Sequence, residues 1–398
     1  MTPRRALAVS LAALAFALPL SIAGTNIALG ILTLALLWSL SADDGGSCAA
    51  LRAALRSPVF AALAAYAAWE AISALGGVDP AASLGLWPKD LHKIWVFLAV
   101  WAALAEAGDG LVAPAMGAGL GLHALVGLVQ GLTALFDRTG AVRAHGFVHP
   151  VTYGEILGLG LIAAASFLAR PGRALGTPVQ RRSAFAFIAL MSVALILNET
   201  RAVALALAAA FAAVCLIEAR WRRRALAAAL VVVGVFVLWE VMPTGGRNLR
   251  TLFADTPQTE SHRSRLILWD IAWNAGLEHP VFGLGSGQYK TAFIAAHTEP
   301  LDGQTVWSNA HNLYLHQLAE RGFPGLIAIL AVLGAMAAGA WRAAKDRADA
   351  WALAAWAASA AFFLMNMTET AWQTEQVGTL FLFLWLLGAG PRRSREIL

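Results

Sequence analysis

The chain has 398 residues, of which 59% are hydrophobic and only 13% are charged, and its formal net charge at pH 7 is +5. Soluble domains carry about 25% charged residues, so this composition excludes an ordinary soluble protein. The apolar runs are about 18 to 22 residues long, close to the length that a helix needs to cross the hydrocarbon core of a bilayer. The predicted fold class is therefore an all-α integral membrane protein.

Twelve apolar runs, bounded by Pro, Gly or charged residues, predict twelve membrane-spanning helices. The first run follows Met1 and a pair of arginines, which resembles a signal peptide, but the next run begins within a few residues and no small-residue cleavage site stands out. We therefore expect a retained first helix. In chain order the runs cover 6–22, 25–40, 57–75, 88–106, 111–136, 152–169, 183–199, 201–219, 225–242, 323–341, 350–368 and 375–390.

The distribution of Lys and Arg predicts how the helices are oriented. With a cytoplasmic N-terminus, most of these cations fall in inner loops, as the positive-inside rule requires. The short outer loops then hold only Lys89, Lys93, Arg138, Arg143 and Arg201. An even number of helices returns the C-terminus to the cytoplasm. The expected organisation is helices one to nine in 1–242, a periplasmic segment in 243–322, and three further helices with a cytoplasmic tail in 323–398.

The stretch 243–309 interrupts the apolar pattern with many Arg, His, Trp, Gly and Asn residues. Basic residues on the outer face are exceptions to the positive-inside rule, so an anionic ligand would account for them. For Lys89, Lys93 and Arg250, anchoring at lipid headgroups by snorkelling is the alternative.

His311 precedes the tenth apolar run. An unperturbed imidazole has a pKa of about 6.5 and can accept a proton from a hydroxyl that becomes a nucleophile. The alternative is a structural histidine at a helix N-terminus. His279, His297, His311 and His316 show no metal-ligand spacing such as HExxH.

Arg263 and Arg265 precede a run in which Leu266, Trp269 or Asp270, and Trp273 recur at helical spacing. This pattern predicts an amphipathic helix on the membrane surface. Guanidinium groups match phosphate oxygens bidentately, so a lipid-linked phosphate is a suitable partner. A solvated charged face is the alternative.

Two further groups of outer residues could bind an anion. Arg201 lies between two apolar runs beside Glu199, and an Arg at a membrane edge marks a functional site by default; a structural ion pair is the alternative. The loop 137–150 combines Arg143 and His145 with glycines that permit close approach of a ligand.

The turn 279–289 has the glycine density of a phosphate-binding loop. It lacks the preceding buried strand and the Lys-Ser/Thr of a nucleotide site. A tight turn that aims Tyr289 and Lys290 is the favoured interpretation.

The stretch 311–325 contains His-Asn, nine further residues, and Gly-x-x-Gly. This arrangement resembles the signature of the O-antigen ligase family, and Arg201–Leu205 resembles the Arg-x-x-x-Leu element of that family. The predicted topology also matches. One departure is Leu326, where the family pattern often has Thr.

This resemblance implies a GT-C-like glycosyltransferase in the inner membrane of a Gram-negative cell, with its active site facing the periplasm. The implied reaction is inverting transfer of O-antigen polysaccharide from undecaprenyl pyrophosphate to lipid A-core, without metal or other cofactor. The partners would be this donor, this acceptor and membrane lipids, with no nucleic acid. His311 would activate the acceptor hydroxyl. By the resemblance, Arg201 and Arg265 would bind the pyrophosphate. From the outer loops and the polar segment we add Arg143 as a further pyrophosphate ligand, with support from Arg263, Asn312, His145, Lys290 and Tyr289.

Three other functions stay open at this point. An O-antigen polymerase uses the same chemistry with a second lipid-linked glycan as the acceptor, and a protein O-oligosaccharyltransferase uses a protein side chain. A transporter or flippase of an anionic lipid or solute would need polar residues inside several spans, whereas most spans here are rich in Ala, Leu and Val. The sugars at the junction and the oligomeric state also stay open, as does whether His311 is a base or only binds substrate.

Overall fold

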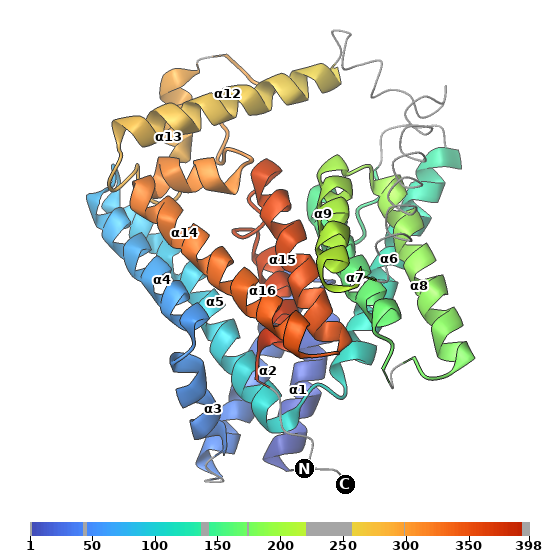
Figure 1. Cartoon of the computed structure of the whole chain (residues 1–398). Helices are drawn as coiled ribbons and strands as arrows, with labels where there is room; N and C mark the ends of the chain where they lie inside the picture. The colour runs from blue at the N-terminus through green and yellow to red at the C-terminus, as the bar shows by residue number, and fades with distance from the viewer. Residues whose placement is uncertain are drawn as a thin grey trace.

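The computed structural model describes residues 2–42, 46–136, 143–172, 175–219, 257–297 and 299–391. This part of the chain is all-α and contains no β-strand, which confirms that the predicted fold is all-helical. The helices, shown in Figure 1, are α1 (Pro3–Ala17), α2 (Ile22–Ser41), α3 (Gly46–Leu55), α4 (Pro58–Gly76), α5 (Pro80–Ala107), α6 (Val112–Phe136), α7 (Pro150–Ala169), α8 (Pro178–Asn198), α9 (Arg201–Ile217), α12 (Pro257–Glu278), α13 (Tyr289–Ala296), α14 (Leu313–Asp346), α15 (Ala350–Thr368) and α16 (Glu375–Ala389).

The described helices are those of a multi-pass membrane protein. Seven of them, α2, α4, α6, α7, α8, α14 and α15, are long and apolar enough to cross a membrane, and α9 and α16 are shorter apolar helices. The predicted run 225–242 and the first part of the polar segment, including Arg250, lie outside the described residues. The count of twelve spans and the division into three parts stay predictions.

One boundary differs from the sequence expectation. Helix α5 begins at Pro80, where the Asp79 side chain accepts a hydrogen bond from the Ala82 amide at 3.0 Å. Lys89 and Lys93 therefore lie within a helix and not in a loop. Lys93 is only 5% exposed, so the headgroup-anchor interpretation is wrong for this residue.

Helix α12 lies across the end of the bundle where α15 ends and α16 begins (Figure 1). One face of α12 packs with α13 and the start of α14 in a second, smaller apolar core, which includes Leu268 and Ala272. Leu266 and Trp273 are exposed on another face. The helix predicted around 266–273 is thus present and has two distinct faces, while its contact with a membrane surface stays a prediction.

A kink divides α14 at Gly322, whose backbone has φ 67° and ψ −172°. Only glycine adopts this region readily. The loop 279–285 packs into the kink, where the Phe323 amide donates to the Pro280 carbonyl at 2.8 Å and the Leu284 amide donates to the Ala319 carbonyl at 2.9 Å. The kink therefore joins this loop to α14.

Replacement of Gly322 by alanine should lower the free energy of unfolding by at least about 3 kcal/mol, from backbone strain together with steric overlap. A Cβ atom at this position would overlap the carbonyl oxygens of Pro280 and Val281. The matched control is Gly334→Ala in the same helix, because a Cβ atom there meets no neighbour within 4 Å. Thermal unfolding of both variants in detergent tests this prediction, which fails if Gly322→Ala is as stable as the control.

Candidate active site

The position of His311 is fixed by the residues on either side of it. Asn312 caps α14 by accepting a hydrogen bond from the Leu315 amide at 3.1 Å, and the Asn309 side chain accepts one from the His311 amide at 3.0 Å. His311 itself has a φ of 48°, in the left-handed region that non-glycine residues seldom adopt. Strained backbone conformations cluster at functional sites. His311 therefore precedes the helix and is held at its entrance.

Glu369 joins the two residues that the sequence placed first among the candidates. His311 Nδ1 lies 2.7 Å from Glu369 Oε2, and Arg265 Nη2 lies 2.7 Å from Glu369 Oε1. The Glu369 side chain is only 11% exposed, whereas those of His311 and Arg265 are 25% and 31% exposed. One nearly buried carboxylate thus orients an accessible imidazole and an accessible guanidinium.

Sequence reasoning missed Glu369, although a signal was present. Glu369 directly follows α15, whose residues are almost all apolar. An ionisable residue at the edge of a membrane run is costly unless it is paired, and it marks a functional site by default. The same argument selected Arg201 from the sequence, and it would also have selected Glu369.

Arg143 connects the loop before α7 to the turn between α8 and α9. Its Nε donates to the Asn198 carbonyl at 2.8 Å, and its Nη2 donates to Thr200 Oγ1 at 2.9 Å. The Asn198 amide group in turn donates to the carbonyls of Ala144 and Pro150, at 2.7 and 2.8 Å. Arg201 is the first residue of α9, immediately after Thr200. This turn therefore holds Arg143 beside the helix terminus that carries Arg201.

The electrostatic neighbours of Arg143 relate this turn to the His311 site. Burial lowers the pKa of the Arg143 guanidinium from its usual value. Glu199 and Glu369 oppose this lowering of the pKa, whereas Arg201 and Arg265 add to it. Arginine nevertheless stays protonated at physiological pH. Arg143 therefore interacts electrostatically with Arg201 and Arg265, and both Arg143 and Arg265 interact with Glu369.

Within the described part of the chain, Arg143 and Arg265 each use only some of their N–H groups. A guanidinium has five N–H groups. Among the described residues, Arg265 contacts Glu369 through Nη2, and Arg143 uses Nε and Nη2. The other N–H groups of these two arginines can bind the oxygens of an anion such as a phosphate.

The supporting candidates divide between the site and the scaffold. Arg263 and Lys290 are exposed on α12 and α13. The His145 amide donates to the Gln130 side chain at 3.2 Å, which fixes the loop that carries Arg143. Tyr289 is fully buried, and its hydroxyl donates to the Leu268 carbonyl at 2.7 Å. The glycine-rich turn therefore aims Tyr289 into the second core and away from solvent.

The two halves of the sequence signature have different structural places. Its His-Asn pair forms the entrance of α14, while its first glycine, Gly322, forms the kink. The second glycine, Gly325, lies where a Cβ atom would overlap Arg321 and approach Trp69. The spacing of the signature thus links the site to the packing of α14 on α4.

Comparison with known proteins agrees with the resemblance seen in the sequence. Residues 186–330 match the family described as O-Antigen ligase. A search of curated proteins finds no match. The matched segment includes Arg201, Arg265 and His311, whereas Arg143 and Glu369 lie outside it. Within the described ranges, no group of three or more His, Cys, Asp or Glu side chains is placed to hold a metal ion.

Proposed function

We propose that this chain, a member of the O-antigen ligase family, transfers O-antigen polysaccharide from undecaprenyl pyrophosphate to a sugar hydroxyl of lipid A-core. The observation that carries the proposal is the bridge by Glu369 between His311 and Arg265. This bridge sets a group that can accept a proton beside a group that can bind a leaving pyrophosphate. Inverting glycosyl transfer to a hydroxyl needs both.

Glu369 determines how His311 could act. When the Nδ1–H group of a neutral imidazole donates to Glu369, the lone pair of Nε2 is left to accept a proton. The Nε2 atom takes this proton from the acceptor hydroxyl as the hydroxyl oxygen attacks the anomeric carbon of the donor glycan. The Glu369 carboxylate then stabilises the imidazolium that forms, as the acid does in other carboxylate–histidine pairs.

The arginines would act on the other side of the anomeric carbon. The bond between this carbon and the pyrophosphate oxygen breaks, and both bonding electrons leave with the undecaprenyl pyrophosphate. Arg265, Arg201 and Arg143 stabilise the negative charge that develops there, and fixed guanidinium groups are most effective in a site of low dielectric constant. Attack from the opposite face inverts the configuration of the anomeric carbon. These steps require no metal ion.

The placement in the membrane is part of this proposal. The end of the bundle covered by α12 (Figure 1) faces the periplasm of a Gram-negative cell, and both termini lie in the cytoplasm. The full chain has twelve spans and a GT-C-like arrangement. The lipid-linked donor reaches the arginines from the outer leaflet of the inner membrane, and lipid A-core approaches His311 from the same leaflet.

A reconstituted transfer reaction tests this function. Purified protein in nanodiscs receives lipid-linked glycan and lipid A-core, with and without excess chelator. We expect glycan attached to lipid A-core at equal rates in both conditions. Longer glycans that remain on undecaprenyl would instead identify a polymerase, and transfer only to an added peptide would identify a protein glycosyltransferase. Movement of labelled lipid across the bilayer without any glycosyl transfer would identify a transporter.

A further inference from the structure

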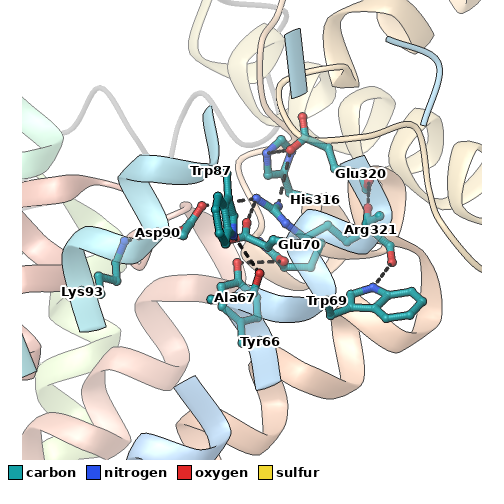
Figure 2. A network of polar contacts seen from close by, with 12 residues as sticks. Tyr66, Ala67, Trp69, Glu70, Trp87, Asp90, Lys93, His316, Glu320 and Arg321 are labelled. Carbon is teal, nitrogen blue, oxygen red and sulfur yellow. Dashed lines mark hydrogen bonds and ion pairs between the residues drawn. The ribbon is translucent and has the colours of Figure 1, made fainter. Parts of the chain in front are cut away.

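A buried group of charged residues lies where α4, α5 and α14 meet (Figure 2). Arg321, at 2% exposure, pairs with Glu70 and lies 3.8 Å from Asp90 and 3.5 Å from Glu320. Buried ion pairs contribute little net stability because desolvation opposes them, but they can specify one arrangement of the elements that they join. We call this group the Arg321 cluster, and it consists of Glu70, Asp90, Lys93, His316, Glu320 and Arg321.

Glu320 connects the Arg321 cluster to the polar end of the molecule. Its Oε1 accepts a hydrogen bond from the Tyr289 amide at 3.1 Å, at the start of α13. Its Oε2 lies 3.3 Å from His316 Nε2, and its backbone carbonyl accepts from the Gly285 amide at 2.8 Å. Ser73 of α4 also donates to this carbonyl, at 3.3 Å. One residue of α14 thereby contacts α13, α4 and the loop before α13.

Tyr289 extends this connection to α12. Its hydroxyl donates to the Leu268 carbonyl at 2.7 Å, and its side chain is fully buried. Leu268 lies three residues after Arg265, so both belong to the same turn of α12. The contact therefore fixes the turn that carries Arg265 relative to α14, which has His311 at its entrance.

The opposite side of the Arg321 cluster reaches the segment that follows Glu369. Lys93 lies 3.9 Å from Asp90, and its amino group is 5.3 Å from the centroid of the Trp372 ring. Trp372 is buried, and its amide donates to the Asn366 side chain at 2.9 Å. The elements that bear Arg265, His311 and Glu369 are therefore all attached to one buried cluster, away from the bridge that Glu369 forms.

We propose that Tyr289 and Glu320 are positioning residues for glycan transfer. They hold α12 on α14 in the register that lets Arg265 and His311 contact the same carboxylate. Neither residue touches the reacting atoms. The effect on rate rests on the proposed function, whereas the effect on the position of α12 does not. Misplacement of a reacting group by about 1 Å can lower a rate by about 10²-fold, so a small shift of α12 is enough to matter.

The test is Tyr289→Phe, which removes one hydroxyl and keeps the buried ring. The matched control is Tyr153→Phe in α7, because Tyr153 is also fully buried and its hydroxyl donates to the Ala124 carbonyl at 3.5 Å. We expect kcat to fall about tenfold in Tyr289→Phe, with a smaller change in the KM for acceptor, and to stay unchanged in Tyr153→Phe. When Arg265 is already replaced by lysine, the further change Tyr289→Phe should not lower kcat again, because the effects of coupled residues are not additive.

Hydrogen–deuterium exchange provides a readout that does not require activity. In nanodiscs, the amides of residues 265–272 should exchange faster in Tyr289→Phe than in the unmodified protein or in Tyr153→Phe. Unchanged exchange there, or rate losses that multiply in the double variant, would overturn the positioning role. If the unmodified protein transfers no glycan but exchange still changes as expected, the proposed reaction is refuted while the attachment of α12 stands.

Discussion

Replacement of His311 by alanine should lower kcat for glycan transfer by about 10²- to 10⁴-fold, the usual contribution of a general base. The acceptor hydroxyl would then lose the imidazole that Glu369 orients as a proton acceptor. The KM for the lipid-linked donor should change little, because the arginines that bind it remain. Initial rates at saturating lipid A-core, measured in nanodiscs, give both constants.

The matched control for this variant is His297→Ala. His297 lies after α13, and its Nδ1 contacts the Glu299 carbonyl at 2.8 Å on the surface. We expect this variant to keep the full rate. A large rise in donor KM with unchanged kcat in His311→Ala would show that His311 binds the donor and does not accept the proton.

Replacement of Glu369 by glutamine should lower kcat by at least about 10²-fold, because the amide keeps the size of the side chain but cannot stabilise an imidazolium as a carboxylate does. Arg265 loses its only carboxylate partner among the described residues at the same time. Removal of one partner of such a nearly buried charge pair is also destabilising. We therefore expect Glu369→Ala to lower the thermal stability more than Glu369→Gln.

The double variant Glu369→Gln with His311→Ala tests whether Glu369 affects the rate through His311. If Glu369 acts through His311, Glu369→Gln should reduce the rate of His311→Ala by little, since residues that act as a unit are strongly non-additive. The control is Glu375→Gln at the start of α16, where Glu375 accepts a hydrogen bond from Asn26 at 2.9 Å. The role of Glu369 would be refuted if Glu369→Gln retained the rate of this control.

If the reaction needs no metal ion, as proposed, metal ions should not rescue these variants. Added divalent cations should restore neither His311→Ala nor Glu369→Gln. Recovery of either variant with a particular ion would show that the site uses that ion, contrary to the reaction proposed for the three arginines.

The helices and several candidate residues could be predicted from the sequence, because they depend on residues that are close together in the chain. The apolar runs predicted the helices, since the length of such a run reflects the thickness of the bilayer. His311 and Arg265 were selected as candidate site residues because a polar residue next to an apolar run is unusual wherever it is packed. The helix around 266–273 was found because its apolar residues recur at helical spacing.

Other features depend on how helices pack and could not be read from local patterns. Anchoring at a lipid headgroup was one of two interpretations of Lys93, but α5 starts earlier and packs this residue beside Asp90 and Trp372. Tyr289 was expected to point from a tight turn toward a ligand, but the second core buries it. In both cases tertiary contacts overrode an expectation based on position in the sequence.

By itself, the sequence determined that this is an all-α membrane protein with a polar, histidine-containing segment, because hydrophobic periodicity and charge are local properties. Only the tertiary structure showed that Glu369 joins His311 to Arg265, across separations of 58 and 104 residues in the chain. No periodicity relates positions so far apart. Their contact is decided by the packing of α12, α14 and α15, which brings two cationic or proton-accepting side chains to one nearly buried carboxylate.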